Sequence, residues 1–355
     1  MEINMKKDTN ASTGYLDILR FIGIIAVIVV HTVSGVSDNF AREMGMRQGQ
    51  IYSAVKAVGT IGVPLFLMVS GALMLDPEKD ISIKKLFEKY LKRMVLALIL
   101  FGMVFALGEM LVKHESGNLL TLFVTAFKRV LAGKSWAHLW YMYVIIGLYL
   151  ALPILRAFVA KADDELMDYA VLLLLIMTSI LPAVLSITGI HMKINFPFKG
   201  VYVTYYILGY YLRKKSPFTE EMKGSLVKLA VLLPLLCVVL ITGSEKIDIS
   251  YSSPIIVIWA IVIYELIRMS CSKAEDKAKS ANSGISVFCG FMREYIFGIY
   301  LIHTVFLNLC YKMLGFTPLM AGGYILIPVF IILDFCVSFV GAWLMRKIPG
   351  LRRIV

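Results

Sequence analysis

The chain has 355 residues, of which 59% are hydrophobic and only 17% are charged, and its mean hydropathy is +0.79. A soluble domain is about half apolar and about a quarter charged, so this composition excludes an ordinary soluble protein and predicts a polytopic membrane protein. A net charge of +12 would suggest nucleic-acid binding in a soluble protein. Here the basic residues gather in particular loops, and we expect no nucleic-acid partner.

The first apolar stretch, residues 15–32 (YLDILRFIGIIAVIVVHT), is too long for a cleaved signal and predicts a first membrane span. Asp17 and Arg20 lie near its start and His31 near its far end. Arg20 and His31 are eleven residues apart, which is roughly 16 Å along a helix and close to the same face. Two interpretations stay open. The pair forms a site for a long ligand with an anionic end and a reactive end, or it is a helix-start anchor plus a histidine satisfied by a neighbouring helix.

Further apolar runs follow at a length that suits tilted membrane helices. They are continuous rather than alternating, which excludes a closed β-barrel. We therefore predict an all-α, polytopic integral membrane protein with about ten transmembrane helices. The sixth run is short and aromatic. The ten predicted spans lie near residues 16–36, 53–75, 94–112, 138–159, 169–188, 199–212, 226–243, 253–271, 295–314 and 321–345.

Most of the 36 basic residues fall in the segments that are cytoplasmic if the N-terminus is cytoplasmic. This bias predicts cytoplasmic N and C termini. In the second cytoplasmic segment, apolar residues recur at helical spacing over 83–94 while lysines and one arginine take the other side, which predicts an interfacial helix leading into the third span. Lys89, Lys92 and Arg93 there either bind anionic headgroups or face an anionic cytosolic ligand.

Two other segments between spans have distinct patterns. Residues 113–137 contain LLTLFVTAFKRVLAG, which predicts a re-entrant or surface helix. Residues 272–292 are rich in polar and small residues and are predicted to be a flexible cytoplasmic linker. No repeat and no second soluble domain is evident, so residues 1–355 are predicted to form a single membrane domain.

Two of the five histidines lie within predicted spans. His303 is about eight residues into the ninth span, where an imidazole must face protein or water because exposure to lipid is costly. His31 and His303 are therefore candidates to meet in the fold. His114 and His191 are expected in solvated outer loops, and His138 at an aromatic membrane interface.

Several other polar residues lie in the spans. Ser70 precedes a glycine in VPLFLMVSGALML, and the small residues serve either close helix packing or a hydrogen bond from Ser70 to a substrate or histidine. Glu109 is near the outer end of the third span, where an acceptor can approach. Asp17 either forms a salt bridge with the arginine three residues later or orients a histidine.

Two further acidic residues occur in later spans. Glu265 and Arg268 form an i, i+3 pair that is expected to be structural. Asp334 lies in the middle of the tenth span and needs a partner that the sequence does not name.

The common catalytic motifs are missing from the sequence. It contains no G-x-S-x-G elbow, P-loop, HExxH or Rossmann fingerprint, and the five cysteines have no CxxC spacing. We therefore expect no metal. An imidazole that titrates near neutrality is the natural general base for activating a hydroxyl, which directs attention back to His31.

Four segments together resemble the acyltransferase family 3 membrane proteins over essentially the whole chain. They are the first span with its R-x10-H pattern, VPLFLMVSGALML in the second, HLWYMYVIIGLYLALPIL in the fourth and IYLIH in the ninth. The resemblance implies ten core spans in the bacterial cytoplasmic membrane. It also implies transfer of an acyl group, usually acetyl, from cytosolic acyl-CoA (acetyl-CoA) to a hydroxyl of a cell-surface glycan or lipid-linked saccharide.

The resemblance gives His31 the catalytic role and makes Arg20 its motif partner, with Ser70 and His303 as lining residues. The family often has paired arginines entering the third span, whereas this chain has Arg93 alone with Lys89 and Lys92 near it. A lysine keeps the charge and loses the bidentate geometry of arginine.

In this interpretation the phosphates of CoA lie near Arg20, Lys92 and Arg93, and the thioester lies near His31. His31 either deprotonates the acceptor hydroxyl directly or carries the acyl group as an acyl-histidine. Ser70 or Tyr300 would stabilise the oxyanion in both cases.

Two other functions compete with this interpretation. One is a transporter or flippase for a lipid-linked saccharide or an acyl donor, which also suits ten spans with scattered charge, although the halves show no repeat. The other is a non-catalytic membrane anchor or sensor subunit. The Arg20–His31 pair argues against a pure anchor, which has no physical need for it.

Overall fold

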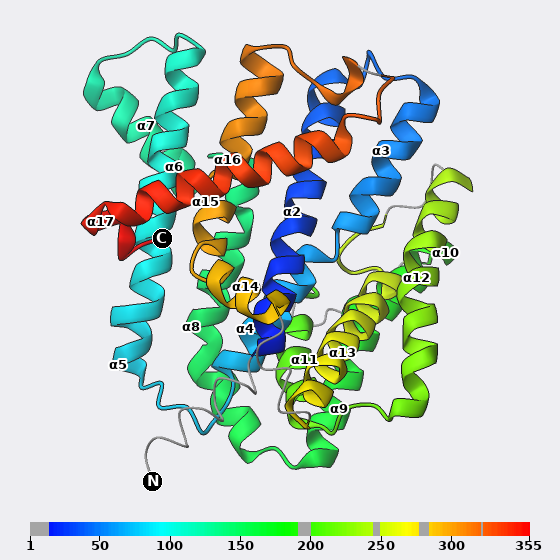
Figure 1. Ribbon diagram of the computed structural model, residues 1–355. Helices are drawn as coiled ribbons and strands as arrows, with labels where there is room; N and C mark the ends of the chain where they lie inside the picture. Colours follow the sequence, from blue (N-terminus) through cyan, green and yellow to red (C-terminus); the bar gives the residue numbers. More distant parts are fainter. Residues whose placement is uncertain (1–13, 191–199, 244–248, 277–283, 321) are drawn as a thin grey trace. The chain divides into compact units, whose positions relative to one another are not determined.

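The computed structural model describes residues 14–190, 200–243, 249–320 and 322–355, except for 277–283 (Figure 1). Every regular element within these residues is helical, and nine helices are long and apolar enough to cross a membrane. The predicted all-α, polytopic membrane class is confirmed. The nine candidate spans are Gly14–Phe40, Met46–Met74, Ile83–Val112, Ala137–Lys161, Asp164–Thr188, Glu220–Gly243, Pro254–Cys271, Ile296–Met313 and Ile327–Lys347.

The chain divides into two compact units, here called the larger unit (residues 1–76 and 162–339) and the smaller unit (residues 77–161 and 340–355). The helices of the larger unit are α2 (Gly14–Phe40), α3 (Met46–Gly59), α4 (Gly62–Met74), α9 (Asp164–Leu175), a π-helix η3 (Ile176–Ile180), α10 (Leu181–Thr188), α11 (Tyr202–Lys214), α12 (Glu220–Gly243), α13 (Pro254–Asp276), α14 (Gly284–Met292), α15 (Ile296–Asn308), a π-helix η4 (Leu309–Met313) and a 3-10 turn η5 (Pro318–Met320). The smaller unit contains α5 (Ile83–Lys85), a π-helix η1 (Leu86–Leu91), α6 (Lys92–Val112), α7 (Leu119–Leu131), a 3-10 turn η2 (Ala137–Leu139), α8 (Trp140–Lys161) and α17 (Pro349–Arg352), and α16 (Ile327–Lys347) runs from the larger unit into the smaller one.

Two predicted segments, the sixth span and the linker, differ from the structure, whereas the helix that leads into the third span is present. The sixth predicted span is α11, whose 13 residues cover about 20 Å and fall short of a hydrocarbon core of about 30 Å. The predicted interfacial helix at 83–94 is continuous with the third span, since helix runs from Ile83 to Val112. The predicted linker is helical at both ends, up to Asp276 and again over α14, and its residues 277–283 lie outside the described part.

Most side chains of helix α11 are buried inside the larger unit. Tyr205 and Tyr206 on it are completely buried. It crosses α4 at two glycines, Gly71 and Gly209, where the backbones touch: a Cβ on Gly71 would overlap the carbonyl of Tyr206, and one on Gly209 would overlap the carbonyl of Met68. The close-packing interpretation of the small residues in this span is therefore confirmed for Gly71.

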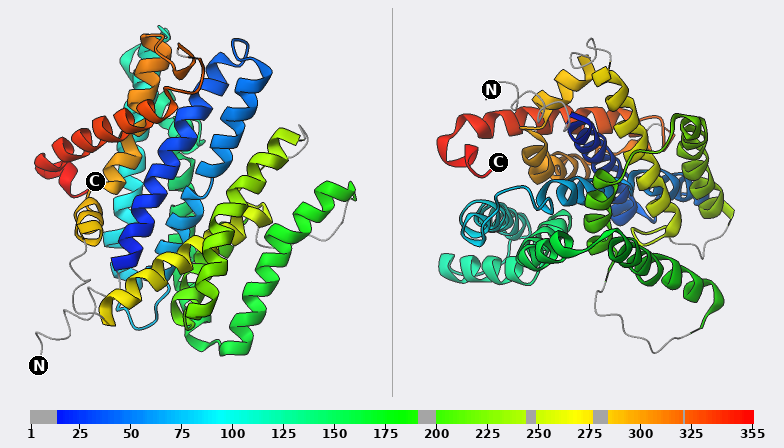
Figure 2. Two further views of the ribbon diagram at one scale, coloured as in Figure 1. Left: turned by 45° about the vertical axis from the view of Figure 1, so that its right-hand side comes forward. Right: turned by 90° about the horizontal axis from the view of Figure 1, so that it is seen from below.

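Helices α2 and α3 form an antiparallel hairpin joined by a short turn, and α2 is the central helix of the larger unit (Figures 1 and 2). Besides α3, helices α4, α13, α14 and α15 all pack against it. Side chains near both ends of α2 are completely buried, such as Leu16, Leu19 and Val36. The residues that α2 presents to its neighbours are therefore held in a fixed frame.

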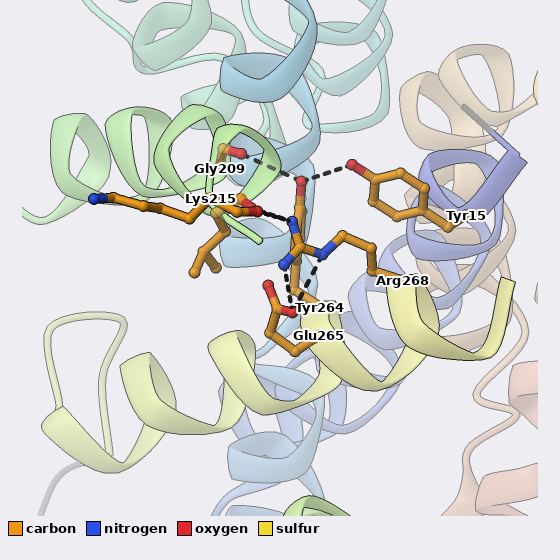
Figure 3. A network of polar contacts seen from close by, with 7 residues as sticks. Tyr15, Gly209, Lys215, Tyr264, Glu265 and Arg268 are labelled. Carbon is orange, nitrogen blue, oxygen red and sulfur yellow. Dashed lines mark hydrogen bonds and ion pairs between the residues drawn. The ribbon is translucent and has the colours of Figure 1, made fainter. Parts of the chain in front are cut away.

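A polar network ties the start of α2 to α11 and α13 (Figure 3). The Tyr264 hydroxyl donates to the carbonyl of Gly209 at 3.2 Å, so its own oxygen accepts from the Tyr15 hydroxyl at 3.0 Å. The next residue, Glu265, is paired with Arg268 at 2.7 Å, as the i, i+3 spacing predicted. These contacts fix the helix turn that carries Asp17.

The same arginine ends α11. The guanidinium of Arg268 donates to the carbonyl of Leu212 and, at 3.0 Å, to the carbonyl of Lys215 (Figure 3). The last carbonyls of a helix have no partner within the helix, so this arginine supplies the donors that they need. The pair with Glu265 is therefore structural, as predicted.

In the smaller unit, α7 packs on α6 where Val130 meets Gly102. Asn118 caps α7 by accepting from the backbone N–H of Thr121 at 2.8 Å. The helix predicted within 113–137 is confirmed. Its other face leaves a stripe of apolar side chains exposed, namely Leu119, Leu120, Phe123, Val124, Phe127 and Leu131.

Candidate functional site

The two histidines predicted within spans come together in the larger unit. His31 lies on α2 and His303 on α15, and their ring centroids are 4.8 Å apart with the planes at 76°. Helix α15 packs along α2. The hypothesis that these two spans bring their imidazoles together is confirmed.

Each imidazole is held in the same way by its own helix. Nδ1 of His31 is 2.9 Å from the carbonyl of Val27, and Nδ1 of His303 is 2.8 Å from the carbonyl of Tyr300. A carbonyl oxygen only accepts, so Nδ1 carries the proton in both rings and Nε2 carries the lone pair of the neutral form. The arrangement gives each ring a basic nitrogen that points away from its own helix backbone.

The surroundings of the two rings differ. His303 is completely buried, which agrees with the expectation that it faces protein, whereas His31 is half-buried. Tyr300 is also buried, and its ring centroid is 6.1 Å from that of His303. Ser70 is half-buried on α4, next to Gly71 at the α11 crossing, and its place in the site stays a prediction.

A charged cluster lies at the start of α2. Oδ1 of the buried Asp17 is 2.5 Å from the Arg20 guanidinium, so the predicted salt bridge is confirmed. Its other oxygen, Oδ2, is 3.3 Å from the guanidinium of Arg293, which follows α14. The side chain of Arg20 is 24% exposed and that of Arg293 is 52% exposed.

Arg293 was not among the residues singled out from the sequence. Its signal was present: in REYIFGIYLIH it stands ten residues before His303, much as Arg20 stands eleven before His31. The positive charge of this segment predicts only that it lies on the cytoplasmic side. The link to Asp17 joins residues 276 positions apart, which no local pattern reveals.

The other predicted donor-binding residues belong to the smaller unit. Arg93 donates from Nε to the carbonyl of Ile354 at 2.9 Å. Lys89 lies over the Tyr90 ring at 5.7 Å, and Lys92 is exposed. Their proximity to Arg20 and to a bound donor stays a prediction.

Glu109, the predicted acceptor-side acid, also belongs to the smaller unit. Its carboxylate is paired with the ammonium of Lys113 one turn later at 2.5 Å. The pair is exposed enough to be solvated, and the role of Glu109 stays a prediction as well.

The remaining histidines and Asp334 are outside this arrangement. His138 is buried in the smaller unit, 5.8 Å from the ring of Phe105, and its position at the membrane interface stays a prediction. His114 is exposed, as expected. His191 lies outside the described residues. Asp334 accepts at 3.1 Å from the hydroxyl of Ser338, which is the partner that the sequence did not name.

Metal ligands are not grouped in the part of the chain that the structure describes, where no three His, Cys, Asp or Glu side chains are placed to hold an ion. The α2–α15 contact brings together two imidazoles, and the guanidinium of Arg20 lies near the start of α2.

Comparison with known proteins gives one match. The family model described as an acyltransferase domain matches residues 13–347, which is nearly the whole chain. No curated protein and no solved structure matches. With nine candidate membrane spans and a match over nearly its full length, this chain belongs to acyltransferase family 3 and is a multi-pass membrane protein.

Proposed function

We propose that the protein is a membrane O-acyltransferase, most simply an O-acetyltransferase of the bacterial cytoplasmic membrane. It takes the acetyl group from cytosolic acetyl-CoA and transfers it to a hydroxyl of a cell-surface glycan or a lipid-linked saccharide. The observation that carries the proposal is the α2–α15 contact. It sets two imidazoles 4.8 Å apart on helices that begin at a cluster of arginines.

The donor has the two ends that this helix offers. CoA is anionic at its diphosphate end and reactive at its thioester, with a flexible arm between them. Arg20 and His31 are separated by roughly 16 Å along α2 and lie close to one face. Arginine suits the phosphates because its planar guanidinium donates two parallel hydrogen bonds. The thioester then lies near His31.

His31 acts as the general base. Its Nδ1–H is committed to the carbonyl of Val27, so Nε2 is the atom that accepts the proton of the acceptor hydroxyl. The hydroxyl oxygen attacks the thioester carbonyl, the new C–O bond forms and the C–S bond breaks. The proton then passes from the imidazolium to the leaving thiolate of CoA, so the cycle releases free CoA and needs no outside proton.

Two other residues support the chemistry. Tyr300 or Ser70 donates a hydrogen bond to the oxyanion as the carbonyl becomes tetrahedral. His303, packed edge-to-face against His31, restricts the orientation of the reacting ring. An acyl-histidine intermediate uses the same Nε2 as the nucleophile in two steps, with the acyl group passing first to the ring and then to the hydroxyl.

The test uses purified protein in lipid, acetyl-CoA with a labelled acetyl group, and extracted lipid-linked saccharides as the acceptor. The wild type should produce a labelled ester that mild alkali releases. His31→Asn should lower this rate by about 10²–10⁴-fold, the usual contribution of a general base.

A matched control is available in the chain. His114 is exposed and has a backbone φ of 51°, which asparagine tolerates well, so His114→Asn should leave the rate unchanged. If His31→Asn retains the wild-type rate, the mechanism is wrong. If the wild type binds no acyl-CoA and instead moves lipid-linked saccharides across vesicles, the transporter interpretation replaces the proposal.

A further inference from the structure

Arg293 stands outside the residues so far assigned to the donor. We propose that it is a second arginine of the donor's phosphate site, and that Asp17 positions both guanidiniums. This inference rests on the proposed function and adds to it a residue that recognises the anionic end of the ligand from the turn between α14 and α15. The buried carboxylate of Asp17 contacts both arginines.

Asp17 contacts both arginines of this cluster. It uses one oxygen for Arg20, at 2.5 Å, and the other for Arg293, at 3.3 Å. The guanidinium of Arg293 has five N–H donors, and the carboxylate of Asp17 accepts from one of its terminal nitrogens. A polyanion with several acceptor oxygens matches the donors that the half-exposed Arg293 presents.

The exposure of the cluster fits a binding role. The side chain of Asp17 is only 7% exposed, whereas that of Arg293 is 52% exposed. The acid is therefore on the inside and the arginines reach outward from it. A buried carboxylate that orients two half-open guanidiniums presents their remaining donors without the entropy cost of fixing two free side chains.

The spacing along the two helices repeats. On α2 the arginine and histidine are eleven residues apart, and in the segment leading through α15 they are ten residues apart. Asp17 contacts Arg293 where both segments begin, and His31 contacts His303 further along, so the two segments run parallel. Each of the two parallel segments thus places a cation at its beginning and an imidazole further along. A single ligand with an anionic end and a reactive end accounts for both.

Packing holds Arg293 in this position. Phe288 on α14 packs edge-to-face on Phe21 of α2, with ring centroids 5.3 Å apart. Phe288 is five residues before Arg293, which directly follows the end of α14. Phe21 is adjacent in sequence to Arg20, so this apolar contact joins the two segments that carry the arginines.

The test measures binding of CoA and of pantetheine, which lacks the phosphates and the nucleotide, to the purified full-length protein in lipid. Arg293→Gln should raise the Kd of CoA by about ten- to a hundredfold, the usual range for losing a hydrogen bond to a charged group. The Kd of pantetheine should stay within about twofold. Arg293→Lys, which keeps the charge, should give an intermediate Kd for CoA.

The matched control is Arg42→Gln, because Arg42 is exposed near the other end of α2 and should not touch the donor. Each variant's melting temperature is measured alongside, so that misfolding is recognised. Equal Kd values of CoA for wild type and Arg293→Gln would overturn this inference while leaving the proposed function standing. An equal rise in the Kd of CoA and in the Kd of pantetheine would also overturn this inference. A wild type that binds no CoA would overturn the proposed function itself.

Discussion

The chain contains two acid–arginine pairs with the same i, i+3 spacing on helices of the larger unit, and the structure uses them differently. Asp17–Arg20 has an N···O distance of 2.5 Å and Glu265–Arg268 one of 2.7 Å. The side chains of Glu265 and Arg268 are only 1% and 9% exposed, and we call this the sealed pair. In the other pair the side chain of Arg20 is 24% exposed, and we call it the open pair.

The partners explain the difference. Arg268 uses its other donors on the carbonyls that end α11, so this guanidinium is bound within the fold. Asp17 is shared between Arg20 and Arg293, and the side chain of Arg293 is 52% exposed. A sealed guanidinium is out of reach of a ligand, whereas an exposed one can donate to a phosphate. Replacing the arginine of each pair by methionine should therefore separate an effect on stability from an effect on binding.

The largest effect on stability should come from Arg268→Met. It leaves the carboxylate of Glu265 buried without its cation and removes the donors at the end of α11, which should cost about 3–5 kcal/mol of unfolding free energy. Denaturant titration of the purified protein in mild detergent measures this change in unfolding free energy. Adding Glu265→Gln to the variant should recover part of it, because the stranded charge is then gone. Folded Arg268→Met protein should bind CoA with wild-type affinity, and a lost affinity would show that the sealed pair is not purely structural.

Arg20→Met should have the opposite profile. Asp17 keeps Arg293 as a partner and the arginine is partly solvated, so the loss of stability should be at most about 1 kcal/mol. The Kd of CoA should rise by about ten- to a hundredfold because a charge-assisted contact is lost. The same denaturant titration and a CoA binding curve test both parts. A large destabilisation with unchanged Kd would make Asp17–Arg20 a second structural pair.

The smallest effect should come from the exposed pair of Lys215 with Asp168, whose N···O distance is 3.1 Å. The hydrogen bond to Asp168 raises the pKa of Lys215 above its ordinary value of 10.5. A raised pKa in the folded state means that the contribution is complete below pH 10.5 and is lost as the pH rises through the folded value.

Lys215→Met should accordingly leave the melting temperature at pH 7 almost unchanged, since exposed pairs contribute little. It also leaves intact the backbone carbonyl of Lys215 that Arg268 uses. Melting curves at pH 7 and pH 9 should therefore coincide for wild type and variant. A clear drop at pH 7 would mean that the ammonium, and not the carbonyl, supports the end of α11.

Sequence reasoning succeeded where the signal was local or was set by the cost of burial. The Asp17–Arg20 and Glu265–Arg268 pairs are i, i+3 neighbours. His303 was expected to face protein or water because exposing an imidazole to lipid is costly, and it is buried. The contact of His31 with His303 was a hypothesis, because each imidazole within a span needs a polar neighbour. The membrane class followed from composition.

It failed where a tertiary contact decided the outcome. Arg293 contacts Asp17, which is 276 positions away in the sequence. The basic charge of its segment predicts only that the segment is cytoplasmic. The apolar run of helix α11 predicts a span, yet the helix is mostly buried between other helices and has about two thirds of the length of a span. The packing of His138 against Phe105 is likewise a tertiary contact that no local pattern reveals.

The central claim is that the α2–α15 contact is where an acyl group leaves CoA. It is tested most directly by transfer of labelled acetyl from acetyl-CoA to the saccharide acceptor, catalysed by purified wild type, His31→Asn and His114→Asn. The account predicts transfer by the wild type and His114→Asn, and a loss of about 10²–10⁴-fold in His31→Asn with an unchanged Kd for CoA. Equal rates in all three proteins would contradict it.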